Sequence, residues 1–150
     1  MDSKKKYVDK SDTQIIVTTE TRNNEKQTKF RNKLIEIYGE KCIITDMPKP
    51  IEACHIVPFS ECNNFDISNG LLMSCNIHSL FDSFDISINP KTLCVELLDE
   101  NDYYHKIYNN KKISIPLNLI DTVKTNLKVH YKKFLDKKNN SYKKKPKKSS

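Results

Sequence analysis

The sequence predicts a single domain of the α+β class with charged ends. Two stretches, 26–38 and 117–135, repeat apolar residues at helical spacing, and Gly39 follows the first of them as a helix C-cap. Between them lie short apolar runs separated by Asn, Asp and Pro, a pattern typical of strands and turns. A chain of 150 residues that is 37% hydrophobic can fill one modest core, which favours one domain.

The composition divides the chain into three parts. Residues 1–25 are polar and charged apart from 15–17, so we expect a flexible or loosely docked arm with 15–17 as a candidate strand. Residues 26–136 form the expected folded domain. Residues 137–150 contain seven lysines and no acidic residue, with Asn, Ser and Pro among them, and we expect this tail to be disordered.

The elements expected between the two helices are short. Residues 51–57 predict a strand that ends at a proline, and Asn69-Gly70, a pair typical of hairpin turns, enters a second apolar run. Ser74 is placed to cap a helix. The apolar face of this helix consists of Ile77, Leu80 and Phe81. Further short strands are expected at 84–88, 93–98 and 103–108, with a turn at Asn89-Pro90.

The basic charge is concentrated in the tail. Its seven lysines equal the net charge of +7, so the remaining residues are formally neutral. A basic tail attracts polyanions, nucleic acid before anionic membrane. Alternatively, the tail only keeps the protein soluble, because lysine is abundant throughout the chain. Under the first interpretation the nucleic-acid-binding residues are Lys143, Lys144, Lys145, Lys147 and Lys148.

The cysteines and the hydropathy pattern argue against a secreted or membrane protein. The five cysteines are an odd number at irregular spacing. No apolar stretch approaches the length of a membrane span, and the N-terminus has no apolar signal region. We expect an intracellular protein, cytoplasmic or, in a eukaryotic cell or its virus, nuclear.

One constellation of polar residues indicates chemistry. The order strand, loop, strand, helix lets His55, Asn69 and His78 converge. Hydrolysis of a phosphodiester needs a base to activate water and a cation to neutralise the charge that develops on the phosphate. A neutral imidazole suits the first role, and a histidine on the adjacent helix suits the second. The other two histidines, His105 and His130, are expected to be ordinary surface or core residues.

The residues around this constellation carry a family resemblance. They read Glu-Ala-Cys-His-Ile-Val-Pro over 52–58, Asn-Gly-Leu-Leu over 69–72 and His-Ser-Leu-Phe-Asp over 78–82. Together they resemble the HNH endonuclease motif, in the subgroup with Glu-Ala-Ala-His-Ile-x-Pro. Upstream, Gln27-x-x-Phe30-Arg31 and the run 42–45 are similar to the entry helix and first strand of that subgroup.

The resemblance implies a ββα-metal (His-Me finger) core, with two antiparallel strands and a helix holding one divalent ion. It assigns His55 as the general base, Asn69 as the residue that bonds across the loop and orients this base, and His78 as a metal ligand. Many HNH nucleases carry a metal-binding Asp where this chain has Cys54. Asp82 follows His78 by four residues on one helix face, so it either reaches the ion or bonds nearby backbone.

Two interpretations of Cys54 stay open. As a thiolate ligand it would favour zinc over magnesium, whereas as a small buried residue it would only replace the Ala of the subgroup. No Cys-x-x-Cys pair is present, which argues against a structural zinc knuckle.

We therefore expect a metal-dependent endonuclease that hydrolyses DNA phosphodiester bonds with Mg²⁺, with Mn²⁺ and Zn²⁺ as alternatives. DNA is the expected partner, no membrane contact is expected, and a homodimer would serve double-strand cleavage. The alternatives are a non-catalytic nucleic-acid-binding protein on an HNH-derived scaffold and a structural zinc-binding interaction module.

Overall fold

A computed structural model describes residues 10–58 and 64–144 of the chain, with side chains described between 21 and 141 in these ranges. The first element is the long helix α1, Lys10–Tyr38. It is followed in the chain by β1 (Ile51–His55), the 3₁₀ turn η2 (Ile67–Asn69), β2 (Gly70–Ser74), α3 (Cys75–Asp82), β3 (Ile86–Ile88), β4 (Val95–Leu97), α4 (Tyr103–Tyr108) and α5 (Ile120–Lys144). This mixture of helices and small antiparallel sheets confirms the predicted α+β class.

The hairpin of β1 and β2 lies between two helices. Its strands are antiparallel, and His55 pairs with Gly70 at the end of β1. Successive side chains of a strand point to opposite faces. The face with Glu52 and Cys54 meets α3, whereas the face with His55 and Gly70 meets α1. The hairpin therefore presents different residues to each helix.

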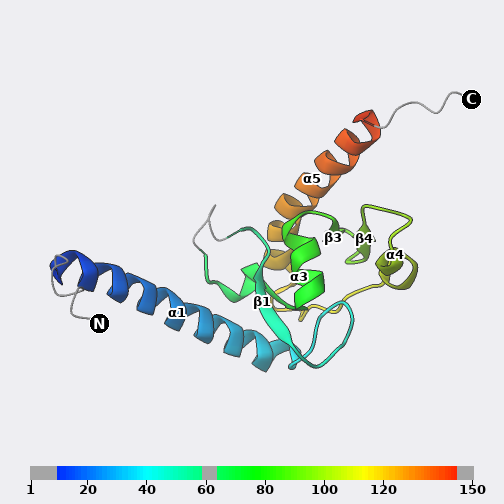
Figure 1. The fold of residues 1–150 in the computed structure, drawn as a ribbon. Coiled ribbons are helices and arrows are strands. Elements are labelled where there is room, and N and C mark those ends of the chain that lie inside the picture. Colours follow the sequence, from blue (N-terminus) through cyan, green and yellow to red (C-terminus); the bar gives the residue numbers. More distant parts are fainter. Residues whose placement is uncertain (1–9, 59–63, 145–150) are drawn as a thin grey trace, which may run out of the picture.

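A second antiparallel hairpin, β3 with β4, completes the domain together with α4 and α5. Helix α4 packs on β4, and α5 packs on both η2 and β3. Asn126 of α5 donates a 3.0 Å hydrogen bond to the carbonyl of Ser68 in η2. Figure 1 shows α1 and α5 extending from the body in different directions, with α3 beside β1 between them. The two long helices thus support the β1–β2–α3 unit from separate sides.

One apolar core joins these elements. Its largest fully buried side chains come from α1, the two hairpins, α3 and α5. They include Phe30, Leu34, Ile56, Leu71, Leu72, Met73, Ile77, Phe81, Ile86, Ile88 and Phe134. The apolar face predicted for the helix after Ser74 is confirmed, because Ile77 and Phe81 are buried there and Leu80 packs against the core.

The predicted C-cap of the first helix is confirmed, but its beginning is not. Gly39 follows Tyr38 with φ +84°, and its N–H donates to the carbonyl of Ile35. The helix begins at Lys10 and not at residue 26, so the strand expected at 15–17 is wrong. No Gly or Pro interrupts residues 10–38, and an uninterrupted polar stretch can extend a helix that the core already anchors at its other end.

Two predicted strands are also wrong. Residues 103–108 form helix α4, because the carboxylate of Asp102 accepts a 2.8 Å hydrogen bond from the N–H of Tyr104 and caps a helical turn. Residues 42–45 form a turn in which the N–H of Asp46 donates to the carbonyl of Cys42, and Asp46 has φ +64°. The strands predicted at 84–88 and 93–98 are confirmed as β3 and β4.

The C-terminal tail differs from the prediction in its first half. Residues 137–144 continue α5 rather than being disordered, since no helix-breaking residue occurs before Pro146 and the last buried side chain, Phe134, anchors the helix. Residues 145–150 lie outside the described residues, as do 1–9 of the N-terminal arm. None of the helices in the described ranges is long and apolar enough to cross a membrane.

Candidate active site

His55 lies at the end of β1 with a polar partner at each ring nitrogen. Its Nδ1 is 3.2 Å from the carbonyl oxygen of Asn64, and its Nε2 is 3.2 Å from Oε1 of Gln27 on α1. Both partners are carbonyl oxygens that only accept, so a neutral ring can donate to just one of them. The bond to the backbone carbonyl of Asn64 is the one that raises the pKa of His55, which favours the proton on Nδ1. Burial lowers the pKa of His55 below its usual 6.5, which favours the neutral ring with its lone pair on Nε2.

Aromatic side chains fix the plane of this ring. Phe30 of α1 stacks on it with the centroids 4.6 Å apart and the planes 10° from parallel, and Phe65 meets it edge-on at 5.5 Å. This stacking depends on Gly70, the strand partner of His55. A Cβ at Gly70 would overlap the ring of Phe30 and come within 2.7 Å of Cδ1 of Leu34. The absent side chain at residue 70 therefore leaves the space in which Phe30 supports His55.

Asn69 holds the loop between β1 and β2 closed. Its Oδ1 accepts a 2.8 Å hydrogen bond from the N–H of Val57, and its Nδ2 donates to the carbonyls of Val57 at 3.1 Å and Asn64 at 3.4 Å. The residue is completely buried. Because the carbonyl of Asn64 also accepts from His55, Asn69 and His55 share one acceptor, and the amide orients the imidazole through it.

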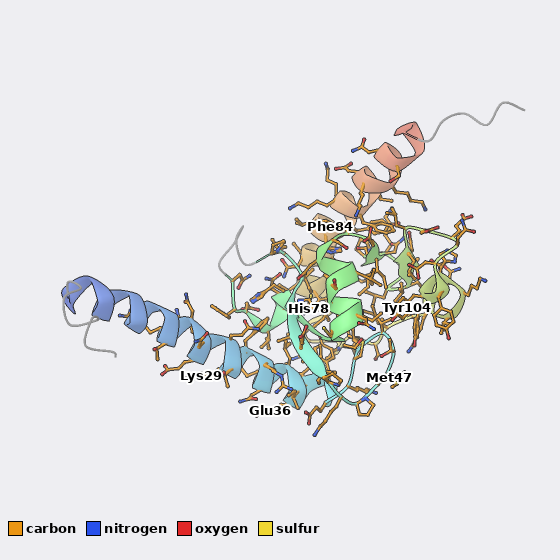
Figure 2. The ribbon with its side chains drawn as sticks, in the orientation of Figure 1. Lys29, Glu36, Met47, His78, Phe84 and Tyr104 are labelled. Carbon is orange, nitrogen blue, oxygen red and sulfur yellow. The ribbon has the colours of Figure 1, made fainter. Side chains whose placement is uncertain are left out.

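His78 lies on α3 between two carboxylates. Its Nδ1 is 2.7 Å from Oε1 of Glu52 on β1, and its Nε2 is 3.1 Å from Oδ2 of Asp82, one helical turn further along α3. The hydrogen bond to Asp82 raises the pKa of His78 above its usual value, and the bond to Glu52 acts in the same direction while burial opposes both. The half-buried imidazole thus joins the first strand to the helix. Figure 2 labels His78 at the centre of the body.

Cys54 contacts Asp82 from the buried side of the group formed by Glu52, His78 and Asp82. Its Sγ lies 3.8 Å from Oδ1 of Asp82, and the side chain is fully buried. Burial, followed by the nearby charge of Asp82, raises the pKa of Cys54 well above that of an ordinary thiol. The thiol is therefore protonated at neutral pH and donates to the carboxylate. One ligand atom each of Cys54, His78 and Asp82 lies within 4.8 Å of the others, a spacing that a single metal ion can bridge.

The structure divides the predicted site residues between two faces of β1. His78 and Asp82 lie together with Glu52 and Cys54 on the α3 face, whereas His55 lies on the α1 face, and Asn69 is buried beneath the loop. The two groups still influence one another, because the charges of Asp82 and His78 both act on the pKa of His55. Cys54 and His55 are consecutive residues of β1, so only the thickness of one strand separates the two groups.

Three contributors were not assigned a role from the sequence. Gln27 and Glu52 belong to the motifs that carry the family resemblance, but these motifs do not show what the two side chains do. Asn64 contributes only its backbone carbonyl, and no pattern of side chains can show this. All three act through hydrogen bonds to His55 or His78.

The remaining histidines and the tail lysines lie elsewhere. His130 is buried in the core, where its Nε2 donates to the carbonyl of Phe81 at 2.7 Å and its Nδ1 accepts from the hydroxyl of Ser87 at 2.7 Å, as expected of a core histidine. His105 lies half-buried on α4. Lys143 and Lys144 are the last two residues of α5, while Lys145, Lys147 and Lys148 lie outside the described residues.

A comparison with protein families identifies the segment that carries these groups. Residues 42–89 match the family model described as HNH endonuclease. This segment contains β1, β2, α3 and β3, and with them all four of His55, Asn69, His78 and Asp82. No curated protein matches the chain.

Proposed function

We propose that this chain, which belongs to the HNH endonuclease family through residues 42–89, is a divalent-metal-dependent endonuclease that hydrolyses phosphodiester bonds of DNA. The observation that carries the proposal is the pairing of two differently tuned histidines. Burial favours the neutral form of His55. His78 lies between the carboxylates of Glu52 and Asp82, which favour positive charge at this position. Hydrolysis of a phosphodiester uses one group of each kind.

His55 acts as the general base. Its Nδ1–H is committed to the carbonyl of Asn64, so only Nε2 can accept the proton of an attacking water. The stacked ring of Phe30 prevents the imidazole from turning away. Because the lowered pKa keeps the ring neutral at pH 7, the base is ready before substrate arrives. Asn69 has a supporting role, since it fixes the shared carbonyl from the opposite side of the loop.

His78 and Asp82 would hold the metal ion. The donor set fits a divalent cation, because Nε2 of His78 and Oδ2 of Asp82 face each other at 3.1 Å. A metal ion can replace the proton that these two atoms share. Glu52 accepts from Nδ1–H of His78 and so leaves Nε2 as the metal-binding nitrogen. A bound Mg²⁺ or Mn²⁺ supplies charge stabilisation for the phosphate and the departing 3′ oxygen, which implies products with 5′-phosphates.

Cys54 supports Asp82 rather than serving as a thiolate ligand. Its raised pKa keeps the thiol protonated, and its S–H points at the carboxylate oxygen that does not face His78. Without a thiolate the donor set lacks the ligand that would select Zn²⁺, and the carboxylate of Asp82 suits Mg²⁺ or Mn²⁺.

Binding of DNA by the lysines at 143–148 and formation of a homodimer stay predictions.

Incubation with supercoiled plasmid tests the proposal directly. The full chain is expected to convert the plasmid to nicked or linear forms with Mg²⁺ or Mn²⁺ and to leave it intact with EDTA. The His55→Ala protein, purified in the same way, is the control for a contaminating nuclease. Plasmid that stays supercoiled with both metals would contradict the proposal. Stoichiometric zinc in protein purified without added metal would favour a structural zinc module instead.

A further inference from the structure

A stripe of basic side chains runs along α1 beside the site. Arg22, Lys26, Lys29 and Lys33 follow one another at intervals of four, three and four residues, which places them on one side of an α-helix. All four are exposed. Within the ranges that the structure describes, none of them takes part in an ion pair, whereas Arg31 on another side of the helix pairs with Glu40. We call these four residues the basic stripe.

The stripe adjoins the part of α1 that supports His55. Lys26 directly precedes Gln27, whose amide lies 3.2 Å from the imidazole, and Lys29 directly precedes Phe30, which stacks on it. At the other end, the positive charge of Lys33 contributes to the lowered pKa of Asp66, so this lysine lies near the loop that carries Asn64. Figure 2 labels Lys29 where α1 leaves the body of the domain.

The charge of this helix surface is positive although the body of the protein is formally neutral. Residues 21–38 carry five basic and two acidic side chains, the latter being Glu25 and Glu36. From Arg22 to Lys33 the stripe covers about 16 Å of helix, at 1.5 Å per residue. Phosphates of one DNA strand follow each other about every 3.4 Å along the duplex axis, so the stripe is long enough to face several of them.

We propose that the basic stripe binds the phosphate backbone of DNA and guides the duplex to His55. The proposal rests on the proposed function for the identity of the partner. It assigns binding to a surface outside residues 42–89 and outside the C-terminal lysines. Lysine and arginine side chains that neutralise phosphates release counterions, so the contribution of the stripe should depend steeply on salt.

Two variants with the same change of charge test this surface. In the first, the four stripe residues are replaced by glutamine. In the second, four exposed lysines from other parts of the chain are replaced by glutamine, namely Lys91, Lys106, Lys112 and Lys128. Binding of a fluorescein-labelled duplex is measured by anisotropy over a salt series, with EDTA present so that no cleavage occurs. Circular dichroism and thermal unfolding check that both variants are folded.

If all four stripe residues contact phosphates, the stripe variant is expected to lower the slope of log affinity against log salt by roughly 3.6, since each contact contributes about 0.9. The control variant should keep the slope of the wild-type protein. A further variant with Lys26, Lys29 and Lys33 replaced by arginine should bind as the wild type does, because it keeps the charge. Equal losses in the stripe and control variants, or no loss in either, would overturn the proposal.

The binding and cleavage assays distinguish failure of this inference from failure of the proposed function. If the stripe variant loses affinity while the wild-type chain never cuts plasmid, the basic stripe stands as a DNA-binding surface and the endonuclease assignment is wrong. If the wild-type chain cuts plasmid and the stripe variant still binds and cuts normally, the endonuclease assignment stands and the inference about α1 is wrong. A stripe variant that keeps its DNA affinity but loses affinity for a matched RNA duplex would also overturn the inference.

Discussion

Oε1 of Gln27 lies 3.2 Å from Nε2 of His55, the nitrogen that accepts a proton in the proposed reaction. A carboxylate at this position would favour the charged imidazolium. Gln27→Glu is therefore expected to raise the pKa of His55 by about 1 to 3 units, as an adjacent opposite charge does. Since a general base at His55 would act only when neutral, the acid limb of the pH–rate profile should move to higher pH by the same amount.

The wild-type profile sets the reference for this shift. Burial lowers the pKa of His55, so cleavage should persist below pH 6.5 and decline as the pH falls through the lowered value. Thr28→Glu is the matched control, because it adds the same charge at the next residue of α1 on an exposed side of the helix. Identical profiles for Gln27→Glu and the wild-type protein would show that Gln27 does not act on the base.

Removal of the base should affect chemistry and little else. His55→Ala is expected to slow cleavage by roughly 10²- to 10⁴-fold, the usual contribution of a general base, and to leave DNA affinity unchanged. Single-turnover rates at saturating metal and anisotropy measure the two quantities. His105→Ala removes a half-buried histidine on α4 and should cut at the wild-type rate. A His55→Ala protein as fast as the His105→Ala protein would rule out the role given to His55.

Gly70 provides a test of the support behind His55. In Gly70→Ala the new methyl group meets Phe30 and Leu34, which should destabilise the fold by about 1 to 3 kcal/mol and displace Phe30 from the imidazole. Gly39→Ala is the control, since nothing lies near its Cβ but its φ of +84° makes the change cost about 1 to 2 kcal/mol.

Urea unfolding and cleavage rates separate the two glycine variants. Both should be less stable than the wild-type protein, but only Gly70→Ala should cut more slowly under conditions where it remains folded. If the two variants lose stability and rate in the same proportion, the contact between Phe30 and His55 has no specific effect on catalysis.

The proposed metal site predicts a graded series of losses. His78→Ala and Asp82→Asn should each weaken Mn²⁺ binding at least 10- to 100-fold, whereas Glu52→Gln, which alters only the partner of Nδ1, should cost about 10-fold. Calorimetry gives the affinities, and added Mn²⁺ should restore part of the cleavage rate. Asp136→Asn on α5 is a control with the same chemical change. Unchanged affinity in His78→Ala would place the ion elsewhere.

His130 should make the fold sensitive to mild acid. Burial lowers its pKa from 6.5 to about 4. Between these values the unfolded chain takes up a proton that the folded protein does not, so stability is lost as the pH falls. The free energy of unfolding should drop by about 1.4 kcal/mol for each pH unit in this window from His130 alone, reaching about 3 kcal/mol.

Urea unfolding at several pH values between 4 and 7 measures this slope. His130→Gln removes the titrating group and should flatten the dependence by the amount that His130 contributes, even if its stability is lower throughout. His105→Gln should retain the wild-type slope. A slope in His130→Gln equal to that of the wild-type protein would contradict the assignment to His130.

The short elements that carry the candidate site residues could be predicted from the sequence. The strand, loop, strand and helix that carry His55, Asn69 and His78 are short, and the residue types at their ends are distinctive. The approach of Asp82 to His78 followed from their spacing of four residues on a helix.

Other features depend on information that no local pattern holds. The tyrosine-rich residues 103–108 have high strand propensity, yet a single hydrogen bond from Tyr104 to Asp102 begins a helix there. The polar residues 10–25 show no apolar periodicity, so their helix could not be predicted from a buried face. The separation of His55 and His78 onto two faces of β1 depends on how α1 and α3 dock, which is a property of the tertiary fold.

The stacking of Phe30 on His55 means that residues 42–89 are not structurally self-sufficient. Residues 42–89 contain His55, His78 and Asp82, but the aromatic ring stacked on His55 comes from α1, and the carbonyl of Phe81 next to Asp82 is held by His130 of α5. A cassette of 42–89 grafted into another protein would carry the reactive groups without the parts that hold them in place. Fusions built on this protein should therefore include both long helices if the proposed cleavage is to be retained.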